Sequence, residues 1–179
     1  MNTETGMIRK ATVEDAQAIC DIYNYYIENT IVTFEEEAVS VAEMENRITE
    51  TKLKFPWFVY CDKDTDKVVG YAYASRWRSR SAYQYSVESS VYVDKDSGGK
   101  GIGTKLYQEL INKLISLGYH AVIGGVAIPN DTSLNLHEKL GFEKVAHFNQ
   151  VGKKFDEWID VEYWQLALDK YASLVTTPA

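Results

Sequence analysis

The feature that most constrains the fold of this chain is a glycine-rich turn between a strand-like segment and a helix-like one. The turn follows Ser90-Val-Tyr-Val93 and runs over Asp94–Gly103. After it, apolar residues recur at helical spacing up to the stop signal Gly118: Ile102, Leu106, Leu110, Leu114 and Leu117. Bare backbone amides at a helix N-terminus can approach an anion, and the helix dipole favours negative charge there. The sequence therefore predicts a strand, a phosphate-binding turn and a helix.

Two common nucleotide-binding folds use a similar turn, and the sequence fits neither of them. A Rossmann fold places the turn after its first strand, with an acidic residue about 20 positions later. Here the turn falls past mid-chain, after several strand-like segments. A P-loop ends in Gly-Lys-Ser/Thr, which Gly101-Ile-Gly-Thr104 lacks. The rest of the chain must therefore identify the ligand.

The segments around the turn alternate between helical and strand patterns. Capping patterns at Thr12–Asp15 and Ser40–Glu43 predict two helices, and the first has an apolar stripe at Ala16, Ile19, Tyr23, Tyr26 and Ile27. The strand-like segments, two of which read as an antiparallel hairpin, are 57–61, 68–73, 83–93, 119–127, 145–151 and 158–168, with a short helix ending at Leu140. We expect a mixed α/β (α+β) fold whose mainly antiparallel central sheet is flanked by helices.

Composition sets the number of domains and excludes several kinds of partner. With 179 residues, 45% of them hydrophobic, we expect one domain over residues 7–170, a disordered tail at 1–6 and a C-terminal tail at 171–179. The net charge of -7 disfavours nucleic acid. Lacking a signal-like or membrane-spanning segment, the protein is expected in the cytoplasm. Cys20 and Cys61 have no metal-like spacing to histidine, so we expect reduced core thiols and no metal.

A second motif lies further along the chain. It is the segment Asn130-Asp-Thr-Ser-Leu-Asn-Leu-His137-Glu-Lys-Leu-Gly-Phe142. Together with Gly98-Gly-Lys-Gly-Ile-Gly103 it resembles the two-part signature of the GNAT acetyltransferase superfamily. Gly98 stands where that family usually has Gln or Arg, and His137 stands where it has Tyr. The resemblance implies the GNAT fold and binding of acetyl-coenzyme A by the following residues: Val91, Tyr92, Val93, Gly98, Gly99, Lys100, Gly101, Ile102, Gly103, Thr104, Asn130 and Ser133.

Matching stretches over nearly the whole chain resemble, more narrowly, the phosphinothricin and methionine sulfoximine N-acetyltransferases. They are Ile8–Thr12, Ile22–Asn24, Thr33–Phe34, Pro56–Trp57, Gly70–Ala72, Trp77–Tyr83, Val87–Val93, Val151–Phe155 and Trp158–Asp160. This resemblance implies a small amino-acid-like acceptor, with Glu88 and His137 acting near its amino group. It also implies that Val91 and Val93 line the acetyl-pantetheine arm, and that the chain forms a homodimer with 151–160 near the shared surface or the pocket.

The residues themselves support acid–base chemistry at Glu88. It is the one carboxylate in the run Tyr83–Val93, where a buried charge costs free energy without a partner or a function. Transfer from a thioester to an amine needs a group that takes the proton of the amine, and His137 is a candidate acid for the departing thiolate. In the alternative interpretation Glu88 faces solvent and His137 is a hydrogen-bonded core residue.

An arginine-rich segment before that strand is the predicted acceptor pocket, because guanidinium groups can bind a carboxylate or phosphinate bidentately. The predicted acceptor residues are Phe34, Arg78, Arg80, Ala82, Tyr83 and Tyr85. Phe34 and Trp158 fit a pocket wall, the core or a dimer interface equally well. A protein N-terminal or lysine acetyltransferase and a noncatalytic acyl-coenzyme A sensor are the competing functions, and a negative chain with an Arg/Tyr-rich pocket favours a small anionic acceptor.

Overall fold

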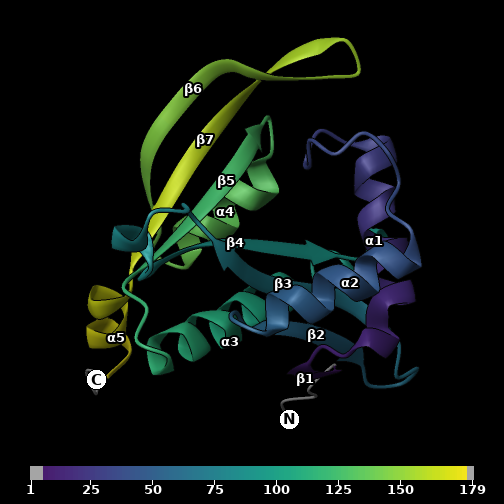
Figure 1. Ribbon diagram of the computed structural model, residues 1–179, viewed down its shortest axis with the longest axis horizontal. Helices are drawn as coiled ribbons and strands as arrows, with labels where there is room; N and C mark the ends of the chain where they lie inside the picture. The colour runs from purple at the N-terminus through teal and green to yellow at the C-terminus, as the bar shows by residue number, and fades with distance from the viewer. Residues whose placement is uncertain (1–5, 177–179) are drawn as a thin grey trace.

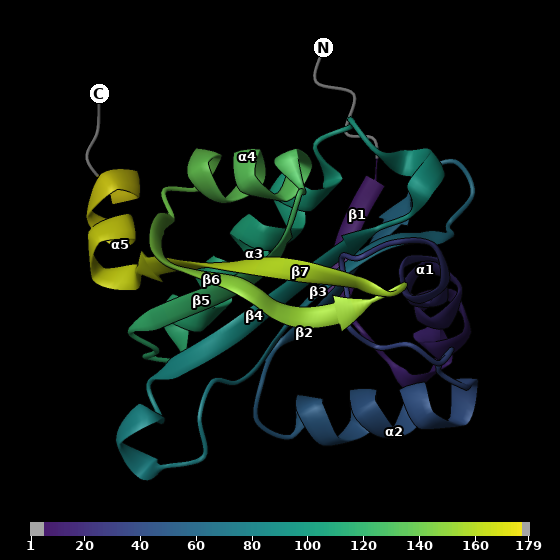
Figure 2. The same cartoon turned by 90° about the horizontal axis from the view of Figure 1, so that it is seen from above.

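In the computed structural model, which describes residues 6–176, seven strands form one sheet in the order β1-β2-β3-β4-β5-β7-β6 (Figures 1 and 2). Neighbouring strands are antiparallel except β4 and β5, which are parallel. The strands are β1 Gly6–Lys10, β2 Trp57–Asp62, β3 Val68–Arg76, β4 Ser86–Val93, β5 Ala121–Ile128, β6 Glu143–Lys154 and β7 Glu157–Ala167. The predicted mixed fold with a mainly antiparallel sheet is confirmed.

Helices cover both faces of the sheet, and each face has its own apolar core. On one face α1 (Ala16–Asn29) and α2 (Val41–Lys52) pack against Val59 and Tyr71. On the other face α3 (Ile102–Ser116) buries Leu106 and Leu110 together with Ala72, Val122 and residues of β7. The alternation of β-strand side chains explains the division, since Val59 faces one core while its neighbours Phe58 and Tyr60 face the other. The predicted apolar stripes of α1 and α3 are therefore the surfaces that bind the sheet.

Several predicted boundaries differ from the structure: β3 and β6 are longer than predicted and β5 begins two residues later. Two further differences have a clear physical reason. The strand expected from Tyr83 begins at Ser86, because 81–83 form a 3-10 turn in which Tyr83 N donates to Arg80 O. The chain was expected to leave the folded domain after residue 170, but α5 (Leu168–Thr176) continues, since Leu168 and Tyr171 pack against the core. Residues 1–5 of the expected N-terminal tail lie outside the described part, and Gly6, also assigned to that tail, instead begins β1 and pairs with Asp62. Between Gly6 and Thr176, no helix is long and apolar enough to cross a membrane.

The centre of the sheet opens where β4 and β5 part. These strands pair over only three positions, the last of which joins Glu88 to Ile123. From Ser89 to Val93, β4 continues to pair with β3, while β5 pairs with β7 over its whole length. One edge of the second half of β4 is therefore left without a strand neighbour, and the glycine-rich turn follows directly after it.

Candidate active site

The glycine-rich turn adopts a backbone that favours glycine at two positions. Gly99 and Gly101 have φ angles of +75° and +73°, in the left-handed region that strains other residues. Gly101 is the N-cap of α3, so the first N–H groups of α3 have no acceptor within the helix. They form, with the helix dipole, a site for a negatively charged group.

A cavity of about 470 Å³ extends from this turn along the free edge of β4 to the start of α4 (Asp131–Lys139). A Cβ atom on Gly98, Gly99 or Gly101 would meet no protein atom within 4 Å, so the space over the turn is open to a ligand. The cavity is lined by these residues of the predicted coenzyme set: Val91, Tyr92, Val93, Gly98, Gly99, Gly101, Ile102, Gly103, Thr104, Asn130 and Ser133. Lys100 belongs to the turn but is not among the lining residues.

The two halves of the sequence motif meet across this cavity. Asn130 caps α4, because its Oδ1 accepts from Ser133 N at 3.1 Å. A Cβ atom on Gly103 would lie 3.5 Å from Leu136 and 3.7 Å from Val93, which places the start of α3 beside α4 and the end of β4. An open diphosphate site, a free strand edge and an amide-bearing helix start fit a long, phosphorylated carrier such as coenzyme A.

A larger cleft of about 770 Å³ lies between β1, β2 and α3, and its described lining contains none of the predicted site residues. Within the described part of the chain, no group of three or more His, Cys, Asp or Glu residues is placed to hold a metal ion. The cavity beside the glycine-rich turn is therefore the one in which the predicted residues converge.

Glu88 lies where β4 and β5 part, just beyond the residues of β4 that line the cavity. Its side chain reaches over β5, because a Cβ atom on Gly125 would lie 3.6 Å from Glu88 Oε1. Burial raises the pKa of this half-buried carboxyl, and the positive charge of Arg78 opposes that shift. Among residues 6–176 it has no hydrogen-bond donor. A carboxylate with a raised pKa and free oxygens is suited to accept a proton.

His137 is buried on α4, with 4% of its surface exposed. Its Nδ1 lies 2.7 Å from Ser133 O and so carries a proton, and its Nε2 lies 3.2 Å from the Tyr107 hydroxyl. Burial lowers the pKa of His137, although the bond to the Ser133 carbonyl acts in the opposite direction. The neutral ring therefore accepts from Tyr107 at Nε2. Glycine at 124 is required beside it, because a Cβ atom there would collide with that nitrogen.

Tyr107 is a buried partner of His137 that the sequence analysis missed. Its hydroxyl joins His137 on α4 to Ser89 on β4, whose Oγ is 2.5 Å away. Burial raises the pKa of Tyr107, so the hydroxyl keeps its proton. Tyr107 follows Leu106 and precedes Leu110 by three positions, so it shares the buried face of α3. A buried tyrosine hydroxyl needs a hydrogen-bond partner, so the position of Tyr107 on this face was the signal that could have indicated such a contact.

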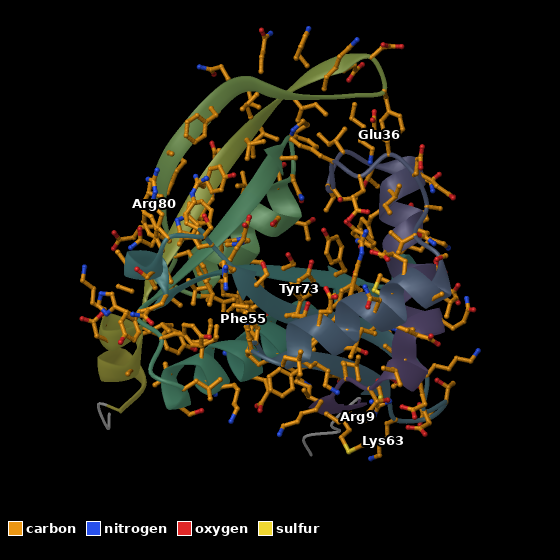
Figure 3. All side chains as sticks on the ribbon, in the orientation of Figure 1. Arg9, Glu36, Phe55, Lys63, Tyr73 and Arg80 are labelled. Atoms are coloured by element: carbon orange, nitrogen blue, oxygen red, sulfur yellow. The ribbon has the colours of Figure 1, made fainter. Side chains whose placement is uncertain are left out.

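The predicted acceptor residues do not all lie at one place in the structure. Arg78 is close enough to act electrostatically on Glu88 and on Tyr163 of β7, and its guanidinium lies 4.6 Å from the Trp77 ring centre. Tyr83 and Tyr85 are exposed, as are Arg80 and Ala82 in the same segment, and no described contact joins any of these four to Glu88. Figure 3 shows Arg80 on the opposite side of the molecule from Glu36 in the loop between α1 and α2.

Phe34, the remaining acceptor candidate, lies in that loop. A Cβ atom on Gly152 of β6 would collide with the Phe34 ring, so the ring rests directly on the hairpin of β6 and β7. The structure thus brings Arg78 to Glu88 and Phe34 to β6.

Comparison with known proteins identifies the family of this chain. The Acetyltransferase (GNAT) domain family matches residues 8–163. The phosphinothricin N-acetyltransferase of Streptomyces viridochromogenes is 37% identical over 88% of this chain and 85% of its own. The L-methionine sulfoximine/L-methionine sulfone acetyltransferase of Salmonella typhimurium is 36% identical over 93% of this chain and 96% of its own. A crystal structure of a phosphinothricin acetyltransferase from Sinorhizobium meliloti in complex with acetyl-coenzyme A is 34% identical, with a TM-score of 0.89 over 98% of this chain and 94% of that one.

We expect Gly101→Val to weaken binding of acetyl-coenzyme A by about tenfold or more, because a branched side chain would strain a left-handed residue and occupy the space over the turn. Titration calorimetry measures the affinity directly. Gly118→Val is the matched control: Gly118 also has a positive φ, of +79°, but lies at the far end of α3. It should lower thermal stability and leave affinity unchanged. Equal affinities of Gly101→Val and the wild type would contradict the assignment of the turn.

Proposed function

Because this chain belongs to the GNAT acetyltransferase family and is therefore an acetyl-coenzyme A-dependent N-acetyltransferase, we propose that its acceptor is a small amino-acid-like molecule such as phosphinothricin or methionine sulfoximine. The observation that carries the proposal is the half-buried Glu88 beside Arg78 at the point where β4 and β5 part. The Glu88 carboxylate can accept a proton, and the Arg78 guanidinium can bind an anion. An amino acid presents both an ammonium and a carboxylate to such a pair.

In this proposal the glycine-rich turn binds the diphosphate of the coenzyme, which supplies the acetyl group. Main-chain N–H groups at the start of α3 supply the donors, and Lys95 and Lys139 also line the cavity. Glu88 takes a proton from the acceptor ammonium, so that the amine becomes a nucleophile. Arg78 orients the acceptor through its anionic group, which leaves the amine beside the carboxylate.

On the other side of the reacting centre we propose an acid made of Tyr107 and His137. His137 Nδ1 is fixed by the Ser133 carbonyl, and Nε2 is occupied by the Tyr107 hydroxyl. In this proposal the Tyr107 hydroxyl gives the leaving sulfur the proton that it donates to His137 Nε2 before the reaction. Ser89, hydrogen-bonded to the same hydroxyl, lies on β4 directly after Glu88. In this proposal His137 is a positioning residue for Tyr107, whereas the sequence analysis expected His137 itself to be the acid.

We expect the purified protein to release free thiol from acetyl-coenzyme A in the presence of phosphinothricin, methionine sulfoximine or methionine sulfone. The panel should also contain the common amino acids and short peptides with free N-termini or lysines. Turnover with small acceptors at least about tenfold above that with peptides would support the proposal. Preference for peptides would favour the protein acetyltransferase, and no turnover with tight coenzyme binding would favour a sensor.

We expect Glu88→Gln to lower kcat by about 100-fold and leave the affinity for acetyl-coenzyme A unchanged, as for loss of a positioned base. Burial raises the pKa of Glu88, so wild-type activity should fall as the pH drops through a value above the ordinary glutamate range near 4.5, where the carboxylate becomes protonated. That acidic limb of the pH profile should be absent from the variant. Glu143→Gln, at an exposed position of β6, is the control. A variant with wild-type kcat would remove Glu88 from the mechanism.

We further propose that two copies of the chain associate through the hairpin of β6 and β7. The hairpin extends beyond the rest of the sheet (Figure 1) and carries these exposed apolar side chains: Val145, Phe148, Val151, Phe155 and Trp158. Sedimentation should give about twice the chain mass of 20.4 kDa, and Trp158→Glu should shift the protein towards the monomer. A wild-type monomer would contradict this proposal.

A further inference from the structure

A buried lysine at the end of β6 binds a segment that lies far away in the sequence. Lys154 is 2% exposed, and its Nζ donates to Thr30 O and to Thr33 O, each at 2.8 Å. Both carbonyls belong to the loop between α1 and α2, in which Phe34 is the predicted acceptor residue. The end of the hairpin and this loop also lie near each other in Figure 1.

The charge of Lys154 has no carboxylate at ion-pair distance within the described residues, all of whose salt bridges involve other groups. The ammonium lies 5.0 Å from the Phe155 ring centre, and burial lowers its pKa while the charge of Glu36 opposes that shift. Burying an ammonium group costs free energy unless its N–H groups donate hydrogen bonds. The two carbonyls therefore account for its stability, and an apolar residue would fill the same space without binding the loop.

Phe34 lies between two attachment points of this loop. On one side Lys154 holds the Thr33 carbonyl, and the Phe34 ring rests on Gly152, two positions earlier in β6. On the other side Glu35 binds Arg47 of α2 at 2.7 and 3.2 Å and accepts from Tyr23 of α1 at 2.8 Å. The loop thus joins the helical half of the molecule to the hairpin, with an aromatic ring fixed at the junction.

We propose that Lys154 is a positioning residue for the acceptor: by binding the Thr30 and Thr33 carbonyls it holds Phe34 against Gly152 as a wall of the acceptor pocket. The inference rests on the proposed function for the identity of that pocket. It assigns acceptor affinity to a contact between β6 and the loop. The loop contributes Val32 to the lining of the coenzyme cavity, whereas the glycine-rich turn and the helix N-termini of that cavity belong to α3 and α4, which Lys154 does not contact.

We expect Lys154→Met to raise the KM for the acceptor about tenfold, while kcat and the affinity for acetyl-coenzyme A change by less than about twofold. Hydrogen exchange should show lost protection of the amides from Thr30 to Glu36. Lys153→Met is the matched control, because Lys153 is exposed on the same strand and pairs with Asp156. It should leave the acceptor KM and the exchange rates unchanged.

Gly152→Ala tests the same contact from the other side, since its methyl group must displace the Phe34 ring. It should raise the acceptor KM in the same way, and the double variant should be less impaired than the product of the two single effects. If Lys154→Met does not fold, Gly152→Ala decides alone. An unchanged acceptor KM in a folded variant of an active enzyme would overturn the inference. If the wild-type protein is inactive with every acceptor, the proposed function is refuted. Hydrogen exchange then tests the inference alone, and unchanged exchange of the loop in Lys154→Met would overturn it.

Discussion

The parting of β4 from β5 after Glu88 is the constraint on which the rest of the site depends. Had the two parallel strands continued together, the backbone of 89–93 would be bonded within the sheet and no cavity could run beside it. β5 instead stays with β7 along its whole length. The gap leaves backbone groups free for a bound carrier at one end, and at the other end it places Glu88 over Gly125, partly out of water.

The charge of the chain explains why the anion site is built from backbone. A protein with a net charge of -7 attracts a polyphosphate poorly at long range, so local donors must supply the attraction. Gly99 and Gly101, with left-handed φ angles, turn main-chain N–H groups towards the open space. Lys100 lies in the same turn but does not line the cavity, whereas Lys95, near the start of the turn, and Lys139, at the end of α4, do.

Sequence reasoning succeeded where the determinants are local. The helical stripe of α3, the cap of α2 and the hairpin of β2 and β3 each depend on residues close together in the chain. The resemblance added the coenzyme residues, because the motif that carries them is short and ordered. It could not show the parting of β4 and β5, the hydroxyl of Tyr107 between two elements, or the contact of Lys154 with a loop 121 positions earlier. These features exist only after distant segments have packed.

The same distinction separates the two halves of the active site. The proposed coenzyme half is formed mainly by one strand, one turn and two helix starts, with Tyr26 and Val32 also lining it, so short motifs can preserve most of it. The proposed acceptor half takes residues from the loop after α1, the segment before β4 and the hairpin of β6 and β7, and the loop contacts the hairpin through Lys154 and Phe34. A substitution at one such contact can move a pocket wall without disturbing the turn. Relatives at 36–37% identity whose names give different acceptors fit this arrangement, since the acceptor can change while the acetyl donor stays the same.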